Sequence, residues 1–186
     1  MKNYIQIFVA AALISLAVFS RVILHLPNFA ALAAVGLFAG FYFRGKIAFL
    51  VPLLAVLISD LFIGFYDLGS MLFVYVAWIV PVFIGRWNLN LKVRNKFLNS
   101  ILTTGSKSLM ASVSFYVVSN FGVWLFSGMY EKSLFGMVQC YTFALPFFRS
   151  ALMGDLLFSG VLFGTFYLVQ AFASDKKQPQ PVYLDK

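Results

Sequence analysis

Charge, sulfur and imidazole are all scarce in this chain. Only 11% of its 186 residues are charged, with 14 bases against 6 acids, and it has one cysteine and one histidine. A single cysteine excludes a disulfide within the chain and a cysteine-based metal cluster, and one histidine cannot build a multi-histidine metal site. The sequence also lacks the GxxxxGK[ST] phosphate loop, the HExxH zinc motif and the GxSxG serine elbow. Any use of ATP would therefore need a partner protein.

Hydrophobic sequence takes the place of the missing charge. The chain is 62% hydrophobic with a mean hydropathy of +0.91, whereas soluble domains are about 45–50% apolar. Its length admits about six spans of roughly 20 residues. A net charge of +8 would suggest nucleic acid in a soluble protein, but here the bases lie between apolar runs, where they set membrane topology. We predict an all-α integral membrane protein, one transmembrane domain over residues 1–173, with no nucleic-acid partner.

The apolar runs predict six transmembrane helices, at about residues 4–23, 29–43, 47–65, 71–84, 100–119 and 147–173. Residues 120–132 are polar and glycine-rich, which favours a surface or re-entrant segment. Residues 134–145 form a short apolar piece that Pro146 is expected to end. The small residues of 29–43 suit close helix approach, which we assign to packing inside the bundle rather than to a partner-docking face. Residues 174–186 are predicted to be a disordered cytoplasmic tail.

Basic residues are distributed unevenly between alternate loops. With the N-terminus inside, six spans place these bases in the cytoplasm: Lys2, Arg44, Lys46, Arg86, Lys92, Arg94, Lys96, Lys176 and Lys177. The outer side then holds chiefly Arg21, Lys132 and Arg149. This asymmetry predicts a multi-pass protein of the bacterial inner membrane with both termini in the cytoplasm.

Three charged residues interrupt otherwise apolar runs. Arg149 and Asp155 lie in LPFFRSALMGDLLFSG, residues 145–160, and Asp60 lies in ISDLFIGF. A charge in a membrane helix costs ~2.5–3.5 kcal/mol, so each marks either a functional site or a structural ion pair. Six positions separate Arg149 from Asp155, which puts them on different faces of a helix. We predict that they pair with other helices, Arg149 with Asp60.

In this topology polar side chains from several helices converge near the outer face, as in a ligand pocket. The candidate ligand-binding residues are His25, Asn28, Asp60, Asp67, Tyr75, Asn120, Trp124, Arg149 and Asp155. A lone histidine such as His25 can be a hydrogen-bonded structural residue or a ligand to a bound molecule. Cys140 lies in an apolar piece and is interpreted as a packed thiol.

Three stretches together carry a resemblance. They are HLPN at 25–28 running into the Ala/Gly-rich helix, Ser59-Asp60-Leu61 with the loop before Tyr75, and LPFFR at 145–149 with Gly154-Asp155. Over about residues 20–165 the chain resembles small six-helix bacterial inner-membrane proteins similar to the S components of energy-coupling-factor transporters. Within that set it resembles the solitary cobalamin transporter family, BtuM. The resemblance implies an S-component-like bundle that captures a vitamin, cobalamin or another corrinoid, at the outer face, with an energy-coupling ATPase module as a candidate partner.

On that resemblance the corrinoid site would be lined by His25, Tyr75, Arg149 and an aspartate, Asp60 or as the second choice Asp67, with His25 as a possible axial ligand of cobalt. One departure matters. The cobalamin family has a cysteine in the outer loop before the equivalent of Tyr75, whereas residues 67–71 here read DLGSM. Serine does not replace a thiolate as a soft ligand or nucleophile, so reductive decyanation is not expected.

Two other function classes remain open from the sequence. A membrane enzyme would use Asp60, Asp155 and His25 as acid–base groups and would turn over a substrate without moving it. A non-catalytic scaffold would tolerate neutral replacement of Asp60 and Arg149. A transporter predicts a ligand that copurifies with the protein, and a corrinoid would be visible by its red colour.

Overall fold

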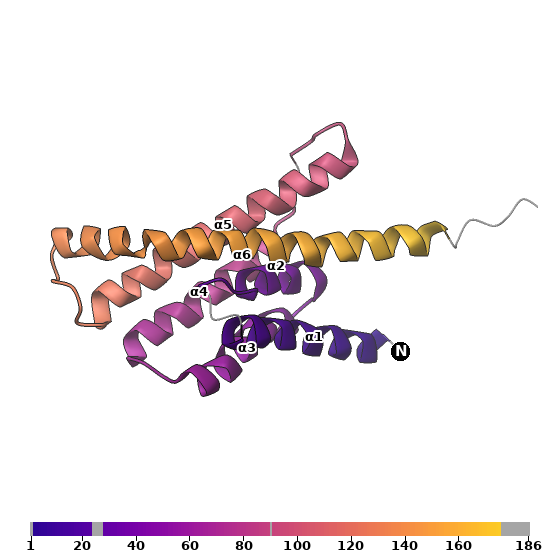
Figure 1. Ribbon diagram of the computed structural model, residues 1–186. Helices are drawn as coiled ribbons and strands as arrows, with labels where there is room; N and C mark the ends of the chain where they lie inside the picture. The colour runs from indigo at the N-terminus through magenta and orange to yellow at the C-terminus, as the bar shows by residue number, and fades with distance from the viewer. Residues whose placement is uncertain (1, 24–27, 90, 176–186) are drawn as a thin grey trace, which may run out of the picture.

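The computed structural model describes residues 2–23, 28–89 and 91–175, which form six α-helices and no strand (Figure 1). The helices are α1 (Lys2–Val22), α2 (Leu32–Tyr42), α3 (Ile47–Ile63), α4 (Leu68–Arg86), α5 (Lys96–Phe126) and α6 (Leu134–Asp175). The prediction of an all-helical chain is confirmed. Of the predicted tail, residues 174–175 belong to α6, and residues 176–186 lie outside the described residues.

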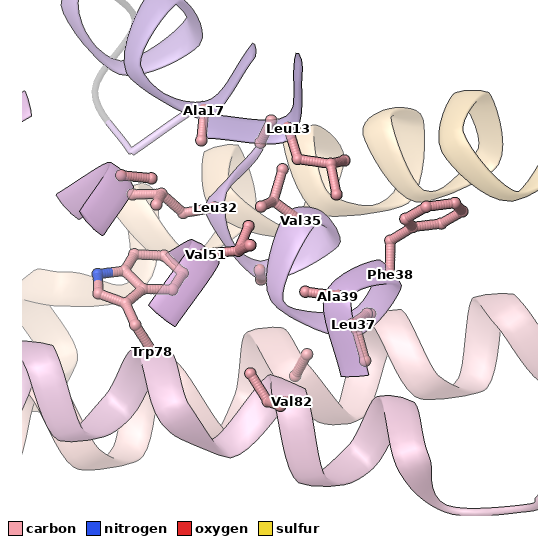
Figure 2. Close-up of a cluster of buried hydrophobic side chains, with 14 of the residues drawn as sticks. Leu13, Ala17, Leu32, Val35, Leu37, Phe38, Ala39, Val51, Trp78 and Val82 are labelled. Atoms are coloured by element: carbon pink, nitrogen blue, oxygen red, sulfur yellow. The ribbon is translucent and has the colours of Figure 1, made fainter. Parts of the chain in front are cut away.

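The short helix α2 forms the centre of the molecule. Every residue from Leu32 to Gly40 is buried, and α2 contacts each of the other five helices. A helix that is hydrophobic all round is stable only when other elements cover it. Figure 2 shows Val35, Leu37 and Phe38 of α2 within the main hydrophobic cluster, with side chains from neighbouring helices around them. The small residues of this segment therefore serve internal packing, as predicted.

Two glycines set the spacing of α2 and α4. A Cβ atom on Gly40 would lie 2.1 Å from the carbonyl oxygen of Val82, and one on Gly85 would lie 2.1 Å from that of Leu37. A larger residue at either position would force α2 and α4 apart. This close approach brings the C-terminal ends of α2 and α4 together.

Four of the six helices are long and apolar enough to cross a membrane, namely α1, α4, α5 and α6. The other two are shorter. The 11 residues of α2 and the 17 residues of α3 extend about 16 Å and 25 Å at 1.5 Å per residue, against a hydrocarbon core of about 30 Å. The prediction of six helices is confirmed, and four of the six have the length of a full membrane span.

The break predicted at Pro146 is absent, because α6 continues through it from Leu134 to Asp175. Proline inside a helix costs about 3 kcal/mol through its missing N–H and its steric clash. Contacts with α5 hold the first part of α6, which precedes Pro146. The Tyr116 hydroxyl donates to the Tyr141 carbonyl oxygen at 2.5 Å, and the Tyr141 hydroxyl donates to that of Val117 at 2.7 Å. These tertiary contacts offset the local cost.

The surface segment predicted at 120–132 is also wrong over its first half, because α5 extends to Phe126. Gly122 does not break the helix. A Cβ atom there would lie 2.3 Å from Cβ of Phe73, so this glycine lets α4 approach α5. The polar side chains find local partners: the Asn120 amide donates to the Tyr116 carbonyl oxygen at 2.8 Å, and the Trp124 indole donates to that of Glu131 at 2.9 Å.

The connections between helices gather at two ends of the bundle. The start of α1, the turn between α2 and α3, the connection between α4 and α5, and the end of α6 lie toward one end (Figure 1). We call it the basic end, because its connections carry Arg44, Lys46, Arg86, Lys92, Arg94 and Lys96. Arg86 ties two of these connections together by donating to the Gly45 carbonyl oxygen at 2.6 Å.

Candidate ligand-binding cavity

A cavity of about 660 Å³ lies between the ends of α1 and α3 and the neighbouring parts of α4, α5 and α6. Its polar lining residues are Arg21, Asn28, Tyr66, Trp78 and Asp155, and the rest of its wall is apolar. A smaller hollow of about 220 Å³ adjoins it and shares Asn28 and Tyr66. Cavities of about 300–1,000 Å³ with a few polar groups in an apolar wall are typical of small-molecule sites.

One wall of the cavity is built on an ion pair between α1 and α3. The Nη1 atom of Arg21 lies 2.6 Å from Oδ1 of Asp60, and it also donates to the Ser59 hydroxyl at 2.6 Å. The Tyr75 hydroxyl of α4 donates to the second carboxylate oxygen of Asp60 at 2.9 Å. Asp60 is fully buried, whereas the Arg21 side chain is 20% exposed. Both carboxylate oxygens of Asp60 thus have a partner behind the cavity wall, and Arg21 lines the cavity.

This pair also compensates an unfavourable helix position. Asp60 lies in the last turn of α3, where the partial negative charge of the helix C-terminus disfavours a carboxylate. Arg21 supplies the missing positive charge. The same carboxylate acts on Tyr66 in the connection after α3: burial, and then the charge of Asp60, raise the pKa of Tyr66 to about 12. A tyrosine phenol keeps its proton at neutral pH, so Tyr66, which is 42% exposed, can donate a hydrogen bond.

Asp155 of α6 reaches the cavity from the opposite wall. It is only 4% exposed, and its Oδ2 accepts a hydrogen bond of 2.6 Å from the Ser112 hydroxyl of α5. In the described part of the chain no lysine or arginine forms an ion pair with it. A buried carboxylate normally needs a cation or several hydrogen bonds. The cavity therefore contains an acceptor with unused capacity.

The apolar part of the wall is aromatic. The rings of Trp78 and Phe115 stack with their centroids 4.0 Å apart and an interplanar angle of 26°. The indole nitrogen of Trp78 is buried without a hydrogen-bond partner, and Figure 2 shows it on the side of the ring away from Val51 of the core. Buried indole N–H groups usually find an acceptor. A flat molecule with an acceptor group would meet both the stacked rings and this donor.

Five of the predicted site residues gather at this end of the molecule. Asn28 and Asp155 line the cavity, and Asn120 lines the adjoining hollow. Asp60 and Tyr75 lie behind Arg21 in the ion-pair cluster.

Three further predicted residues, Asp67, Trp124 and Arg149, do not join them. Asp67 caps α4, accepting from the Ser70 backbone N–H at 2.7 Å, and Trp124 contacts the connection between α5 and α6. Arg149 is exposed on α6, so its predicted pairing with Asp60 is wrong: Arg21 takes that place. His25 lies outside the described residues. Among the described residues no group of three or more metal-ligating side chains occurs.

Sequence reasoning missed Arg21, Ser112, Trp78 and Phe115. Arg21 gave the same signal as Arg149, a base near the end of an apolar run, and only the packing of α1 on α3 distinguishes them. The serine and the two aromatic residues resemble many others in the chain. Cys140 is buried, with its sulfur 3.5 Å from the Asn120 carbonyl oxygen, and it does not line the cavity.

Comparison with known proteins bears on the family alone. No curated protein and no solved structure matches the chain significantly. A family model described as a family of unknown function, DUF6580, matches residues 1–179, nearly the whole sequence. The chain therefore belongs to the DUF6580 family.

Proposed function

We propose that this protein resides in the bacterial inner membrane as a multi-pass protein, with its basic end in the cytoplasm. Four helices have the length and apolar composition of membrane spans. Large apolar side chains such as Phe8, Leu61 and Phe62 are exposed on the outer helices, as expected where lipid rather than water surrounds them. The bases of the connections concentrate at one end, and cytoplasmic loops carry such an excess.

Within that membrane the protein captures a small organic solute for uptake, in the cavity between Arg21 and Asp155. The proposal rests on two groups in the cavity wall: the buried Asp155 carboxylate, which accepts from Ser112 but has no basic partner among the described residues, and the Trp78 N–H, which is buried without an acceptor. Native structures retain few buried groups without partners. A ligand that supplies both partners explains why they are there.

The charges of the site favour a ligand with a positively charged or strongly hydrogen-bond-donating group. Arg21 and Asp60 neutralise each other across 2.6 Å, which leaves Asp155 as the acidic group of the wall that has no basic partner among the described residues. The stacked rings of Trp78 and Phe115 suit a planar or cationic group, because aromatic faces attract cations. The site is thus suited to a ring compound that bears an amine or quaternary nitrogen.

The resemblance to S components makes a vitamin the proposed solute class, with an energy-coupling ATPase module as the proposed source of energy. Cobalamin or another corrinoid remains one candidate within that class. The cavity offers no thiolate to a cobalt ion, because Cys140 does not line it. Chemical selectivity would instead come from Asp155, Trp78 and Tyr66.

The test is ligand identification on the protein purified in mild detergent. Native mass spectrometry should find a bound small molecule, and an absorption spectrum decides whether it is a corrinoid. Asp155→Asn should weaken binding of that molecule about tenfold or more, since a hydrogen bond to a charged group contributes about 1.5–3 kcal/mol. Asp67→Asn is the matched control, because asparagine also caps a helix and Asp67 does not line the cavity.

Three results separate the competing functions. Loss of binding in Asp155→Asn but not in Asp67→Asn supports solute capture. Chemical conversion of the bound molecule, lost with the same variant, would instead indicate a membrane enzyme. A protein that carries no small molecule, and whose Asp155→Asn variant is unchanged in every assay, would leave the scaffold as the better description.

A further inference from the structure

The basic end of the molecule holds a second cavity that solute capture does not use. It has a volume of about 490 Å³ and lies between the C-terminal ends of α2 and α4 and the facing parts of α5 and α6. Along α6, Phe163 and Tyr167 of this cavity are 8 and 12 residues beyond Asp155 of the first, which is about 12–18 Å. The two cavities are therefore separate sites at different depths of the bundle.

The second cavity is lined by bases. Arg44, Arg86 and Lys107 contribute to its wall, and none of its described lining residues is an aspartate or glutamate. Lys107 is only 9% exposed, and its ammonium donates to a single described group, the Gly85 carbonyl oxygen at 3.2 Å. An ammonium has three N–H donors. A buried base with one neutral partner lacks a counter-ion, which an anion in the cavity would supply.

A second, independent feature of the same wall points to a ligand. The hydroxyl oxygen of Thr103 is buried and has no hydrogen-bond partner. Thr103 and Lys107 are one helical turn apart on α5, so both present donors to one region. Together with Arg44, which forms no ion pair within the described residues, they provide the donors that an anion with several oxygens accepts.

Arg86 alone has a sufficient structural role. Its guanidinium donates to the Gly45 carbonyl oxygen at 2.6 Å and lies 4.5 Å from the ring centre of Phe49. Bases near helix C-termini commonly bind carbonyl oxygens in this way. Arg44 and Thr103 make no such contact in the structure, so helix capping accounts for only part of the cluster.

An apolar groove of about 700 Å³ between α5 and α6 continues from this cavity. The two share Thr104, Phe163 and Tyr167. A Cβ atom added to Gly160 or Gly164 in the groove would meet nothing within 4 Å, so the protein itself leaves this space empty. The groove extends along α6 from Leu156 to Ala171, about 22 Å at 1.5 Å per residue. An anion site joined to an apolar groove is complementary to a headgroup with an acyl chain.

We propose that this composite site binds one anionic phospholipid, with its phosphate held by Arg44, Lys107 and Thr103 and one acyl chain in the groove between α5 and α6. The proposal rests on the membrane location proposed above but not on solute capture. A lipid in this position would fill the space between the diverging ends of α5 and α6 and would bind these helices to each other.

The experiment titrates the full chain in detergent and counts bound lipids by native mass spectrometry. The probes are phosphatidylglycerol, phosphatidylcholine with the same acyl chains, and glycerol 3-phosphate as a headgroup without chains. The variants are Arg44→Gln and Thr103→Val, with Lys46→Gln as the matched control. Lys46 is a base of the same end of the bundle that lines neither the cavity nor the groove.

We expect one phosphatidylglycerol to bind more tightly than phosphatidylcholine. Arg44→Gln should weaken it about fivefold, the effect of roughly one base at a lipid surface, and Lys46→Gln should leave it unchanged. Thr103→Val should weaken it without lowering the unfolding temperature of the lipid-free protein, because the hydroxyl has no protein partner to lose. A purely structural role for Thr103 cannot produce that combination.

Three outcomes would overturn the site. If Lys46→Gln weakened phosphatidylglycerol binding as much as Arg44→Gln, the basic end as a whole would attract the lipid and no specific site would be needed. Equal affinity for the two lipids would remove the role of the anion, and glycerol 3-phosphate binding as tightly as the lipid would remove the role of the groove. Cell fractionation is done first: a chain recovered in the soluble fraction refutes the membrane proposal itself, which distinguishes that failure from failure of the lipid site.

Discussion

At the scale of single residues, Arg21 and Asp60 show how one buried charge depends on its partner. Removing Arg21 alone, as Arg21→Met, leaves the fully buried Asp60 carboxylate with the Tyr75 hydroxyl as its hydrogen-bond donor. A buried pair broken on one side typically costs about 3–5 kcal/mol. The double variant Arg21→Met, Asp60→Leu should recover most of that loss, because no charge is then buried.

The measurement is thermal unfolding in detergent for both single variants and the double variant. Arg149→Met is the control, since that arginine is exposed on α6 and should change stability little. If Arg149→Met were as damaging as Arg21→Met, the pairing of α1 with α3 described above would not explain the stability of the fold.

Tyr66 gives a pH-dependent prediction at the same scale. Its pKa of about 12 in the folded protein exceeds the ordinary value of 10.0. Above pH 10 the unfolded phenol loses its proton while the folded one keeps it, so the stability linked to this group falls as pH rises from about 10 to 12. The unfolding midpoint of the unaltered chain should therefore fall more steeply over that window than that of Tyr66→Phe. Parallel curves for the two proteins would contradict the raised pKa.

At the scale of helices, α2 and α4 depend on glycine for their distance. Gly40→Ala would place a methyl group 2.1 Å from a carbonyl oxygen of α4, so the helices must separate. Overpacking of this kind typically costs about 1–3 kcal/mol. Gly105→Ala is the matched control: the glycine is also inside a helix, but its added methyl group meets nothing within 4 Å. That change should stabilise the protein slightly, by up to about 1 kcal/mol. Thermal unfolding of the two variants measures the expected loss of stability in Gly40→Ala and the expected gain in Gly105→Ala. Equal effects would refute the close approach of α2 and α4.

The helices themselves were predictable from hydrophobic runs, while their ends were less so. The sequence predicts α1 and α3 within a few residues, although Pro52 lies inside α3. Pro146 and Gly122 are local breakers that tertiary contacts override: Tyr116 and Tyr141 bridge α5 to α6, and Phe73 occupies the space beside Gly122. A rule based on one residue cannot include a partner that lies tens of residues away.

The candidate site was predictable in its location but not in its pairing. Asp60 and Asp155 stand out in any apolar run, and the structure puts both beside one cavity region. Whether Arg21 or Arg149 pairs with Asp60 depends on how α1 packs against α3. The sequence alone does not specify which residues of these two helices are in contact. Trp78 and Ser112 become distinctive only through their surroundings, an indole N–H without an acceptor and a hydroxyl that meets a carboxylate.

At the scale of the whole molecule, the position of the bases predicts the orientation in the membrane. The turn between α2 and α3 and the connection between α4 and α5 lie together at the basic end. The connection between α3 and α4 has no base, and its Asp67 caps a helix. Because lysine and arginine are retained in the cytoplasm, we expect the basic end to lie inside and the first cavity to lie toward the outer face.

Reporter fusions after Arg94 and after Gly69 test this orientation, each made with alkaline phosphatase and with a fluorescent protein. The fusion after Arg94 should be fluorescent and lack phosphatase activity, and the fusion after Gly69 should show the reverse.

Removing the basic residues is the sharper experiment, because their positive charge is the proposed cause of the orientation. Neutralising Lys92, Arg94 and Lys96 together should reduce the bias and give mixed signals after Gly69, while the exposed Arg149→Gln should not. A fluorescent Gly69 fusion in the unaltered chain would place the cavity on the cytoplasmic side, and uptake from outside would then have no entrance.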